Sequence, residues 1–367
     1  MEALIPKSRP AQGIERRSCA DPFAGAVVSV DPRSDPGWEA LTLAGPSSVF
    51  HSAPWLRVLG KTYGLELNAL IALKADGEPC AGLPFCRLRD MLGHRLVVLP
   101  FSDYCDPLAE ERGDWTLLVE QLVRERCAIY LRCLTSDLPL ADERFAVLKE
   151  AKWHGIDLRA ELDQIWKGIS DAAKRAIKKA RQDGVQLRLA RSEDELRAFF
   201  EMHLRLRKYK YRMLAQPYVF FENIWREFVG NGQGALLLAL YQDEIIAGTF
   251  FLEWKDTLYY KFNASTADHL AYRPNDALIW EGIRYGKAKG YRQVDLGLSD
   301  WDETGLLRFK RKYASAEKSI TFLAHGASDR HAEAKTLLLQ MIRLFTDESV
   351  PDSVTARAGD LLYRYFA

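Results

Sequence analysis

The chain repeats part of its own sequence, and a duplicated unit decides the fold class before any single motif does. Residues 72–82, ALKADGEPCAG, match residues 239–248, ALYQDEIIAG, with one residue deleted. In both stretches an acidic turn separates two segments that continue as strands, which is the pattern of a β-hairpin. Two hairpins can also match by coincidence, so the flanking segments decide whether the whole unit is duplicated.

The flanks of the second stretch predict a mixed order of helices and strands. Ser192–Glu195 is a capping box that opens a helix, a second helix follows Pro217, and Gly290 ends a third. The second half is predicted to contain strands at 185–190, 235–241, 245–254, 257–262, 293–296 and 319–323 and helices at 275–289 and 304–313. The first half shows the same order more weakly, with strands at 26–30, 67–73, 80–88, 95–99, 128–133 and 156–159 and helices at 37–43, 53–63, 115–126 and 142–151.

Two copies of one α/β unit are the simplest account of this order, and 367 residues exceed what one hydrophobic core usually supports. We therefore predict two tandem mixed-sheet domains, 25–165 and 166–326, with a basic amphipathic helix at 169–183 opening the second. An N-terminal extension, 1–24, precedes them. A helical tail, 327–367, follows, and its apolar residues are predicted to share one face: Leu337, Leu338, Met341 and Leu344.

Charge and residue spacing exclude several classes of function. Lys and Arg number 51 against 50 Asp and Glu, so the net charge of +1 supplies no global field for DNA, and none is expected as a partner. No apolar stretch approaches the ~20 residues of a membrane span, and charged residues break up the N-terminus, so we expect a cytoplasmic protein. The cysteines form no C-x-x-C pair and the histidines no ligand spacing, so no metal site is expected.

Several motifs follow one another in an order that carries a family resemblance. They are Ala176–Val185, Tyr259–Ser265, Arg273–Asn275, Asp295–Gly297 and Gly305–Tyr313. On this predicted scaffold they resemble the GNAT acyltransferase unit, and two such units resemble the Fem family of aminoacyl-tRNA-dependent aminoacyltransferases and the related BioF-like acetyltransferases. The resemblance covers about residues 45–325.

The sequence departs from that family at two places. Tyr313 is followed by Ala314, where the family usually has a glycine after the aromatic residue. The [RQ]-x-x-G-x-[GA] loop that cradles the pyrophosphate of coenzyme A in ordinary GNAT units is absent in complete form, and its nearest match, 181–186, fails at the last position.

The resemblance implies an N-acyltransferase that moves an acyl or aminoacyl group to an amine of a cell-envelope precursor or another amine acceptor. It implies no tightly bound cofactor, and leaves acyl-CoA and aminoacyl-tRNA open as donors. The implied partners are a small-molecule or lipid-linked acceptor, a tRNA acceptor stem and a peripheral membrane surface. An inactive duplicated module that binds a carbohydrate or peptide is the alternative from a different class.

Three residues are candidates for catalysis, because acyl transfer to an amine needs alignment and a group that stabilises the developing oxyanion. Lys310 matches, by resemblance, a lysine that binds phosphate or transition-state charge; the alternative is a solvated lysine in a basic helix. Asp295 at a strand end would orient the amine or act as a base, or serve as a turn carboxylate. Tyr260 faces the acceptor by resemblance, or packs in the core.

Candidate binding residues begin with those at helix ends. Arg273 and Asn275 precede a predicted helix whose N-terminus would bind an anion, with an ordinary N-cap as the alternative. Phe309 belongs to the motif at 305–313. Arg212 ends a basic run with interleaved tyrosines, which suits stacking on a nucleotide or RNA end as well as a solvated helix face.

The remaining candidates lie in the first half. Trp55, Asp103 and Tyr104 occur in segments that resemble the acceptor-binding edge of the family. Trp55 also suits a core position.

Overall fold

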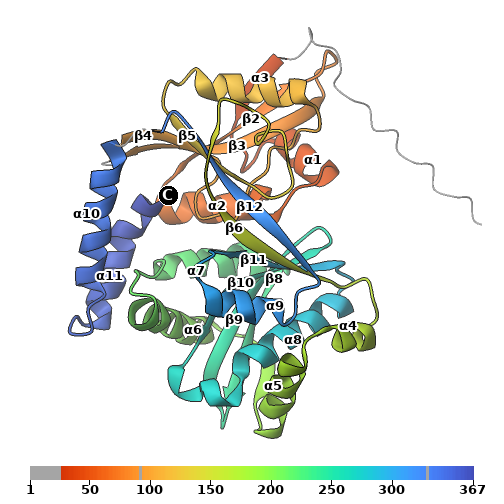
Figure 1. Cartoon of the computed structure of the whole chain (residues 1–367), viewed down its shortest axis with the longest axis vertical. Coiled ribbons are helices and arrows are strands. Elements are labelled where there is room, and N and C mark those ends of the chain that lie inside the picture. The colour runs from red at the N-terminus through yellow and green to blue at the C-terminus, as the bar shows by residue number, and fades with distance from the viewer. Residues whose placement is uncertain (1–25, 91–92, 328–329) are drawn as a thin grey trace, which may run out of the picture.

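A computed structural model of the chain describes residues 26–90, 93–327 and 330–367, so the predicted extension at 1–24 lies outside the described residues. The described strands form one 12-stranded mixed sheet in the order β1-β2-β3-β4-β5-β12-β6-β11-β10-β9-β8-β7. Helices cover both faces of this sheet (Figure 1). The chain is therefore an α/β protein in which two mixed-sheet units share one continuous sheet.

The first half of the chain contributes the following elements: β1 Ala26–Val30, α1 Pro36–Ala44, α2 Ala53–Tyr63, β2 Glu66–Leu73, β3 Pro79–Asp90, β4 Gly93–Val97, α3 Arg112–Val123, β5 Ala128–Cys133 and β6 Ala146–Asp157. The second half contributes α4 Leu162–Gly168, α5 Asp171–Gln182, β7 Gln186–Leu189, α6 Glu193–Arg205, α7 Tyr218–Ile224, β8 Gly234–Tyr241, β9 Glu244–Trp254, β10 Thr257–Ser265, α8 Pro274–Ala288, β11 Gln293–Ser299, α9 Thr304–Arg311 and β12 Ala316–His325. Helices α10 Arg330–Phe345 and α11 Asp352–Leu362 form the tail.

The duplicated hairpins occupy the same place in each half. β2 pairs antiparallel with β3, and β8 pairs antiparallel with β9. Each hairpin leads into a parallel pair joined by a helix: β4 with β5 across α3, and β10 with β11 across α8. The repeat seen in the sequence is thus a repeat of structure.

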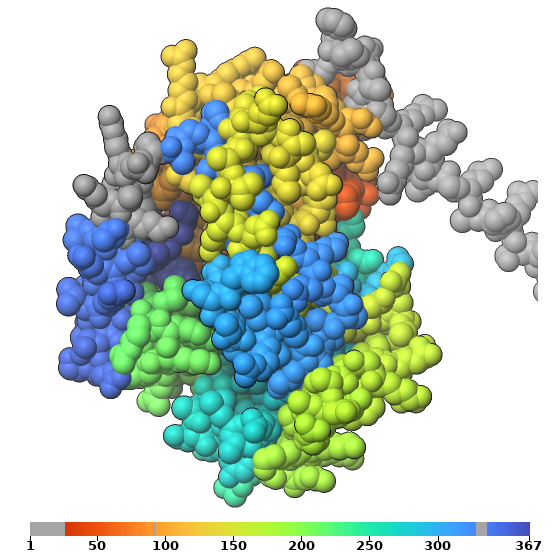
Figure 2. All heavy atoms as spheres, in the orientation of Figure 1, coloured from red at the N-terminus to blue at the C-terminus, as the bar shows by residue number. Residues whose placement is uncertain are grey.

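The two halves exchange their last strands. β12 of the second half pairs with β5 of the first, and β6 of the first half pairs with β11 of the second. The exchanged strands also pair with each other, in the middle of the sheet. Segments of the first half (yellow) and the second half (blue) therefore interleave on the face shown in Figure 2.

The predicted helix at 142–151 is wrong. Residues 146–157 form β6, and the strand predicted at 156–159 is only its end. Ala, Leu, Lys and Glu at 146–151 favour a helix locally, but β6 gains backbone partners on both sides, from β12 and β11. Pairing with residues far along the chain overrides the local preference here.

The tail is helical as predicted, but its buried face is different. Leu338 and Ile342 pack with Leu214 and Ala358, whereas Leu337 and Leu344 are exposed. Leu338 and Ile342 lie on the buried face of α10 because this face packs against Leu214, in the segment after α6. In the part of the chain that the structure describes, we find no helix with the length and apolarity of a bilayer span.

Candidate active site

The parallel strands β10 and β11 separate after three paired residues, and a cluster of charged side chains fills the opening. Their register is Thr257 with Gln293, Leu258 with Val294 and Tyr259 with Asp295. Beyond this point β10 is bulged between Lys261 and Asn263. The register of β11 on β6 also shifts after Asp295. Irregularities on both strands open the sheet where the candidate residues lie.

A loop of the first half reaches into this opening. Lys261 of β10 donates through Nζ to Oδ1 of Asp103, 2.6 Å away, and the backbone N–H of Leu298 donates to Oδ2 of Asp103 over 3.2 Å. The Lys261 ammonium and the Leu298 amide outweigh the opposing effect of burial and lower the pKa of Asp103. Asp103 is therefore a fixed anion at the junction of the two halves.

Lys310 approaches the same place from α9. It is only 3% exposed, and its Nζ donates to the carbonyl oxygens of Gly297, at 3.0 Å, and Leu298, at 2.8 Å. Burial lowers the pKa of Lys310 to about 8, against the pull of Asp103 and Asp295. Two of its three N–H groups are thus engaged by backbone carbonyls, and no acceptor for the third is found among the described residues.

Asp295 forms the second acid of the cluster. Its Oδ1 accepts from the backbone N–H of Gly297 at 2.6 Å, and its Oδ2 accepts from the hydroxyl of Tyr104 at 2.6 Å. Burial raises the pKa of Asp295 in spite of the hydroxyl of Tyr104. A carboxyl with a raised pKa next to a phenol is suited to holding a proton.

Gly297 is required for this packing. Its φ is +69°, in the left-handed region, and a Cβ placed on it would collide with Oδ2 of Asp103. Only a residue without a side chain lets the end of β11 approach the loop that carries Asp103.

The structure therefore brings four predicted residues together: Lys310, Asp295, Asp103 and Tyr104. Lys261 joins them although the sequence did not single it out. Its position inside the motif at 259–265 was the available signal, because a lysine in an otherwise apolar strand needs a buried anion.

Tyr260 points to the other face of the sheet. It is buried there with Phe251, whose ring centroid lies 5.6 Å away, and burial raises its pKa. Trp55 is fully buried in the core, where its indole N–H donates to Oγ of Ser102 over 2.9 Å. Trp55 thus holds the residue next to Asp103.

Arg273 and Asn275 lie at the start of α8, whereas Phe309 lies on α9. Arg273 is exposed at φ +60° and precedes Pro274 at the first turn. Asn275 donates through Nδ2 to Oγ of Ser265 over 3.1 Å, and its Oδ1 is buried without a hydrogen-bond partner among the described residues. Phe309 packs against Tyr313 at 5.5 Å between ring centroids.

The first turn of α8 already carries a carboxylate. Asp276 accepts from the hydroxyl of Tyr313 at 2.6 Å and from Nζ of Lys312 at 2.8 Å. The negative charge of Asp276 already interacts favourably with the positive end of the α8 dipole. Arg273 therefore remains as the exposed cation beside that helix end.

Arg212 lies with the tail and away from the cluster. It donates to Oε1 of Glu348 and, over 3.2 Å, to the carbonyl oxygen of Thr346. Both partners lie in the segment between α10 and α11, so Arg212 anchors that segment. Among residues 26–90, 93–327 and 330–367 there is no group of His, Cys, Asp and Glu that could hold a metal ion.

Comparison with known proteins identifies the fold. Residues 170–311 match the family described as acetyltransferase (GNAT) domain. The crystal structure of FemX aligns with a TM-score of 0.62 at 11% identity, covering 85% of this chain and 100% of that chain. L-PGS from Bacillus licheniformis aligns with a TM-score of 0.54 at 14% identity, covering 87% and 99% of the two chains.

A tandem GNAT protein from the clavulanic acid biosynthesis pathway aligns with a TM-score of 0.52 at 12% identity, covering 83% of this chain and 99% of that chain. No curated protein matches the sequence significantly. At these identities the structural likeness shows the fold alone, and the fold is the tandem GNAT arrangement that the sequence predicted.

Proposed function

From the match of residues 170–311 to the acetyltransferase (GNAT) domain family, we propose that the chain is an N-acyltransferase. It moves an acyl or aminoacyl group to an amine of a cell-envelope precursor, either a peptidoglycan or a polysaccharide unit, or to another amine acceptor. Lys310 is the observation that carries the proposal. A buried ammonium with one unused N–H, at the point where the sheet opens, suits an oxyanion better than it suits packing.

The reaction assigns each member of the cluster a task. The amine nitrogen of the acceptor attacks the acyl carbon, and the electron pair of the carbonyl bond moves to its oxygen. The Lys310 ammonium stabilises that oxygen, and because burial lowers its pKa it is a stronger hydrogen-bond donor than an exposed lysine. Asp295 takes the proton that the amine loses, with Tyr104 bonded to it. The electron pair then returns from that oxygen to re-form the carbonyl bond. The donor leaves as a thiolate, or as an alkoxide that takes the proton held on Asp295.

The donor is proposed to be acyl-CoA or aminoacyl-tRNA. Arg273 beside the N-terminus of α8 supplies a cation for a phosphate of either donor. The exposed residues Arg175, Lys178 and Arg181 of α5 supply further positive charge for a nucleic acid. A tRNA donor predicts binding that weakens steeply as salt rises, and a CoA donor predicts a shallow salt dependence.

A thermal-shift panel of acetyl-CoA, longer acyl-CoAs and charged tRNA, followed by turnover with a set of amines, tests the proposal. A donor at 100 times its Kd should stabilise the protein by about 2.7 kcal/mol. Lys310→Met should lower kcat at least 100-fold, as loss of an oxyanion donor does elsewhere. Arg308→Ala is the matched control, because Arg308 is exposed on the same helix.

Unchanged turnover in Lys310→Met would overturn the catalytic assignment. Stabilisation by a sugar or peptide alone, with no turnover by the wild type, would favour the alternative of an inactive binding module.

A further inference from the structure

Each member of the ion pair between Lys261 and Asp103 has a phenylalanine in left-handed backbone close to it. Phe101 lies two residues before Asp103 and has a φ of +59°. Phe262 directly follows Lys261 and has a φ of +48°. This conformation is costly for a residue with a side chain, because its Cβ crowds the backbone. It persists only where neighbouring groups hold it in place.

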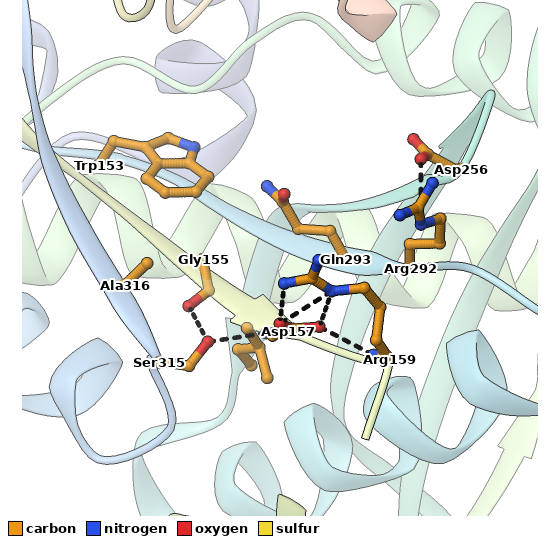
Figure 3. A pocket seen from close by; sticks show the side chains of 10 residues that line it. Trp153, Gly155, Asp157, Arg159, Asp256, Arg292, Gln293, Ser315 and Ala316 are labelled. Atoms are coloured by element: carbon orange, nitrogen blue, oxygen red, sulfur yellow. Dashed lines mark hydrogen bonds and ion pairs between the residues drawn. The ribbon is translucent and has the colours of Figure 1, made fainter. Parts of the chain in front are cut away.

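The exposed ion pairs of the same sheet lack this arrangement. Two of them line a groove of about 480 Å³ where β6 ends, shown in Figure 3: Arg159 with Asp157, and Arg292 with Asp256. Their side chains are between 40% and 66% exposed, so water hydrates these charges as well. The pair between Lys261 and Asp103 is mostly buried, and its geometry therefore depends on contacts within the protein.

One aromatic cluster packs against both phenylalanines. The ring centroid of Phe101 lies 4.5 Å from that of Tyr63, and the centroid of Phe262 lies 5.3 Å from that of Phe220. Tyr63 and Phe220 lie 5.8 Å apart in turn, so the four rings form a continuous row. The cluster thus connects the backbone beside one charge of the ion pair to the backbone beside the other.

Tyr363, just after α11 of the tail, adds a fifth ring to this cluster. Its centroid lies 5.5 Å from that of Phe101 and 6.2 Å from that of Tyr63, on which it stacks with an interplanar angle of 19°. Figure 1 shows this end of the chain, marked C, next to α2, the helix that ends at Tyr63. The tail therefore packs directly against one of the two residues in left-handed backbone.

Asp103 connects the aromatic cluster to Lys310. Its Oδ2 accepts from the backbone N–H of Leu298 over 3.2 Å, and the carbonyl oxygen of Leu298 accepts from Nζ of Lys310 over 2.8 Å. A shift of the loop that carries Asp103 would therefore move the end of β11 that holds Lys310. In a catalytic site, a displacement of about 1 Å can cost on the order of 100-fold in rate.

We propose that Tyr363 is a positioning residue of the reaction. Through the ring of Phe101 it holds the loop that carries Asp103, and Asp103 holds the part of β11 to which Lys310 is bonded. The tail is then a working part of the site. The effect of Tyr363 on turnover rests on the proposed function, whereas its effect on the position of Asp103 does not.

Hydrogen exchange of the full chain, resolved to single amides, tests the geometry without any substrate. In Tyr363→Ala the amide of Leu298 should exchange at least about tenfold faster, because its acceptor Asp103 becomes mobile. The amide of Leu252 is the internal reference, since β9 is paired on both sides there and its exchange reports overall stability. The acceleration at Leu298 should therefore clearly exceed any acceleration at Leu252.

The loop should loosen in this variant without detaching, because Ser102 is held separately by Trp55 and Arg132. Tyr363→Phe keeps the ring and should leave the exchange of Leu298 unchanged. If Tyr363→Ala fails to fold, Tyr363→Leu replaces it in the same measurement, since leucine keeps the apolar contact but not the flat ring.

Tyr365→Ala is the matched control. Tyr365 lies in the same segment as Tyr363, but it packs against the cluster around Leu338 and Ile342 instead of against Phe101. Its variant should exchange at Leu298 as the wild type does.

Turnover by the folded variants tests the second step. Tyr363→Ala should lower kcat at least about tenfold and leave KM within about twofold, because Lys310 acts on the transition state and not on substrate binding. Tyr363→Phe and Tyr365→Ala should both turn over as the wild type does. A selective change at Leu298 with an unchanged kcat would overturn the role of Tyr363 in the reaction.

Equal acceleration of Leu298 and Leu252 in Tyr363→Ala would overturn the positioning role, because it would show only a loss of overall stability. Faster exchange at Leu298 in Tyr365→Ala would overturn it too. If the wild type transfers no acyl group to any amine, the proposed function fails, and the exchange measurements still decide whether Tyr363 positions Asp103.

Discussion

The Lys261 ammonium lies 2.6 Å from Oδ1 of Asp103, and this ion pair joins a strand of the second half to a loop of the first. Their side chains are 9% and 20% exposed, so neither charge is fully hydrated. Removing one partner leaves the other charge unpaired in a poorly solvated place.

We therefore expect Asp103→Ala and Lys261→Met each to lower the free energy of unfolding by about 3 kcal/mol. The double variant should lose less than the sum by at least about 1 kcal/mol, because the pair is lost only once. Urea unfolding of the four proteins measures this coupling. Strictly additive losses would show that the two charges do not stabilise each other.

Lys310 should make stability depend on pH in a defined window. Its pKa is about 8 in the folded chain, against the ordinary lysine value of 10.5, so the unfolded chain binds more protons between these values. The free energy of unfolding then rises with pH from 8 to 10.5, by on the order of 3 kcal/mol. Lys310→Met should lack this rise. Parallel pH profiles of the wild type and the variant, from urea unfolding, would contradict the depressed pKa.

Two glycines near the site should respond in opposite ways to alanine. Gly297→Ala forces a Cβ against Asp103 at a positive φ, so it should cost at least about 2 kcal/mol and reduce turnover. Gly305→Ala meets open space in the first turn of α9 and should stabilise by about 0.5 kcal/mol. Thermal unfolding of both variants, with turnover measured alongside, separates the two. A neutral Gly297→Ala would mean that the loop and β11 are not tightly apposed.

The chain should lose stability in mild acid because His203 is buried in its neutral form. Burial lowers its pKa to about 3, although Nε2 is hydrogen-bonded to Gln216 at 2.8 Å. Below pH 6.5 His203 is protonated in the unfolded chain but stays neutral in the folded chain. The free energy of unfolding therefore decreases as pH falls. Between pH 6.5 and 5 this loss is roughly 2 kcal/mol. His203→Gln should lose correspondingly less over the same interval in urea unfolding, and equal losses would contradict the assignment.

Lys208 and Asp352 hold the tail on the second half. The Lys208 side chain is fully buried, and its Nζ donates to Oδ1 of Asp352 over 2.8 Å. Asp352→Asn should therefore cost about 2 kcal/mol, because the Lys208 charge loses its anion. Asp360→Asn is the control, since Asp360 is exposed and pairs with Arg357 at 3.5 Å. Similar melting temperatures for both variants would show that the tail does not depend on this pair.

Local signals predicted most elements of the fold. The capping box at Ser192, the Gly290 stop and the hairpin turns all act over a few residues, and the structure has a helix or hairpin at each. The strand β6 and the buried face of the tail were not predictable in this way. Both are decided by partners more than one hundred residues away, β11 and β12 for the strand and Leu214 for the tail.

The site shows the same division. Lys310 and Asp295 were singled out within their motifs, whereas Lys261 lies in the motif at 259–265 without having been singled out. Its role is explained by the Asp103 that faces it. Tyr260 and Tyr259 are adjacent on β10 and point to opposite faces, so a one-residue difference decides which of them lies near the cluster.

The exchange of β6 and β12 has a consequence for how the chain can be divided. A fragment that ends after β6 lacks the strand that should cover β5, and the remaining fragment lacks the strand that should cover β11. Each piece therefore displays an unpaired sheet edge that only the other can close. Separately produced pieces cut at the α4 boundary should reassociate into one working complex, as a split reporter does, and neither should persist as a monomer by itself.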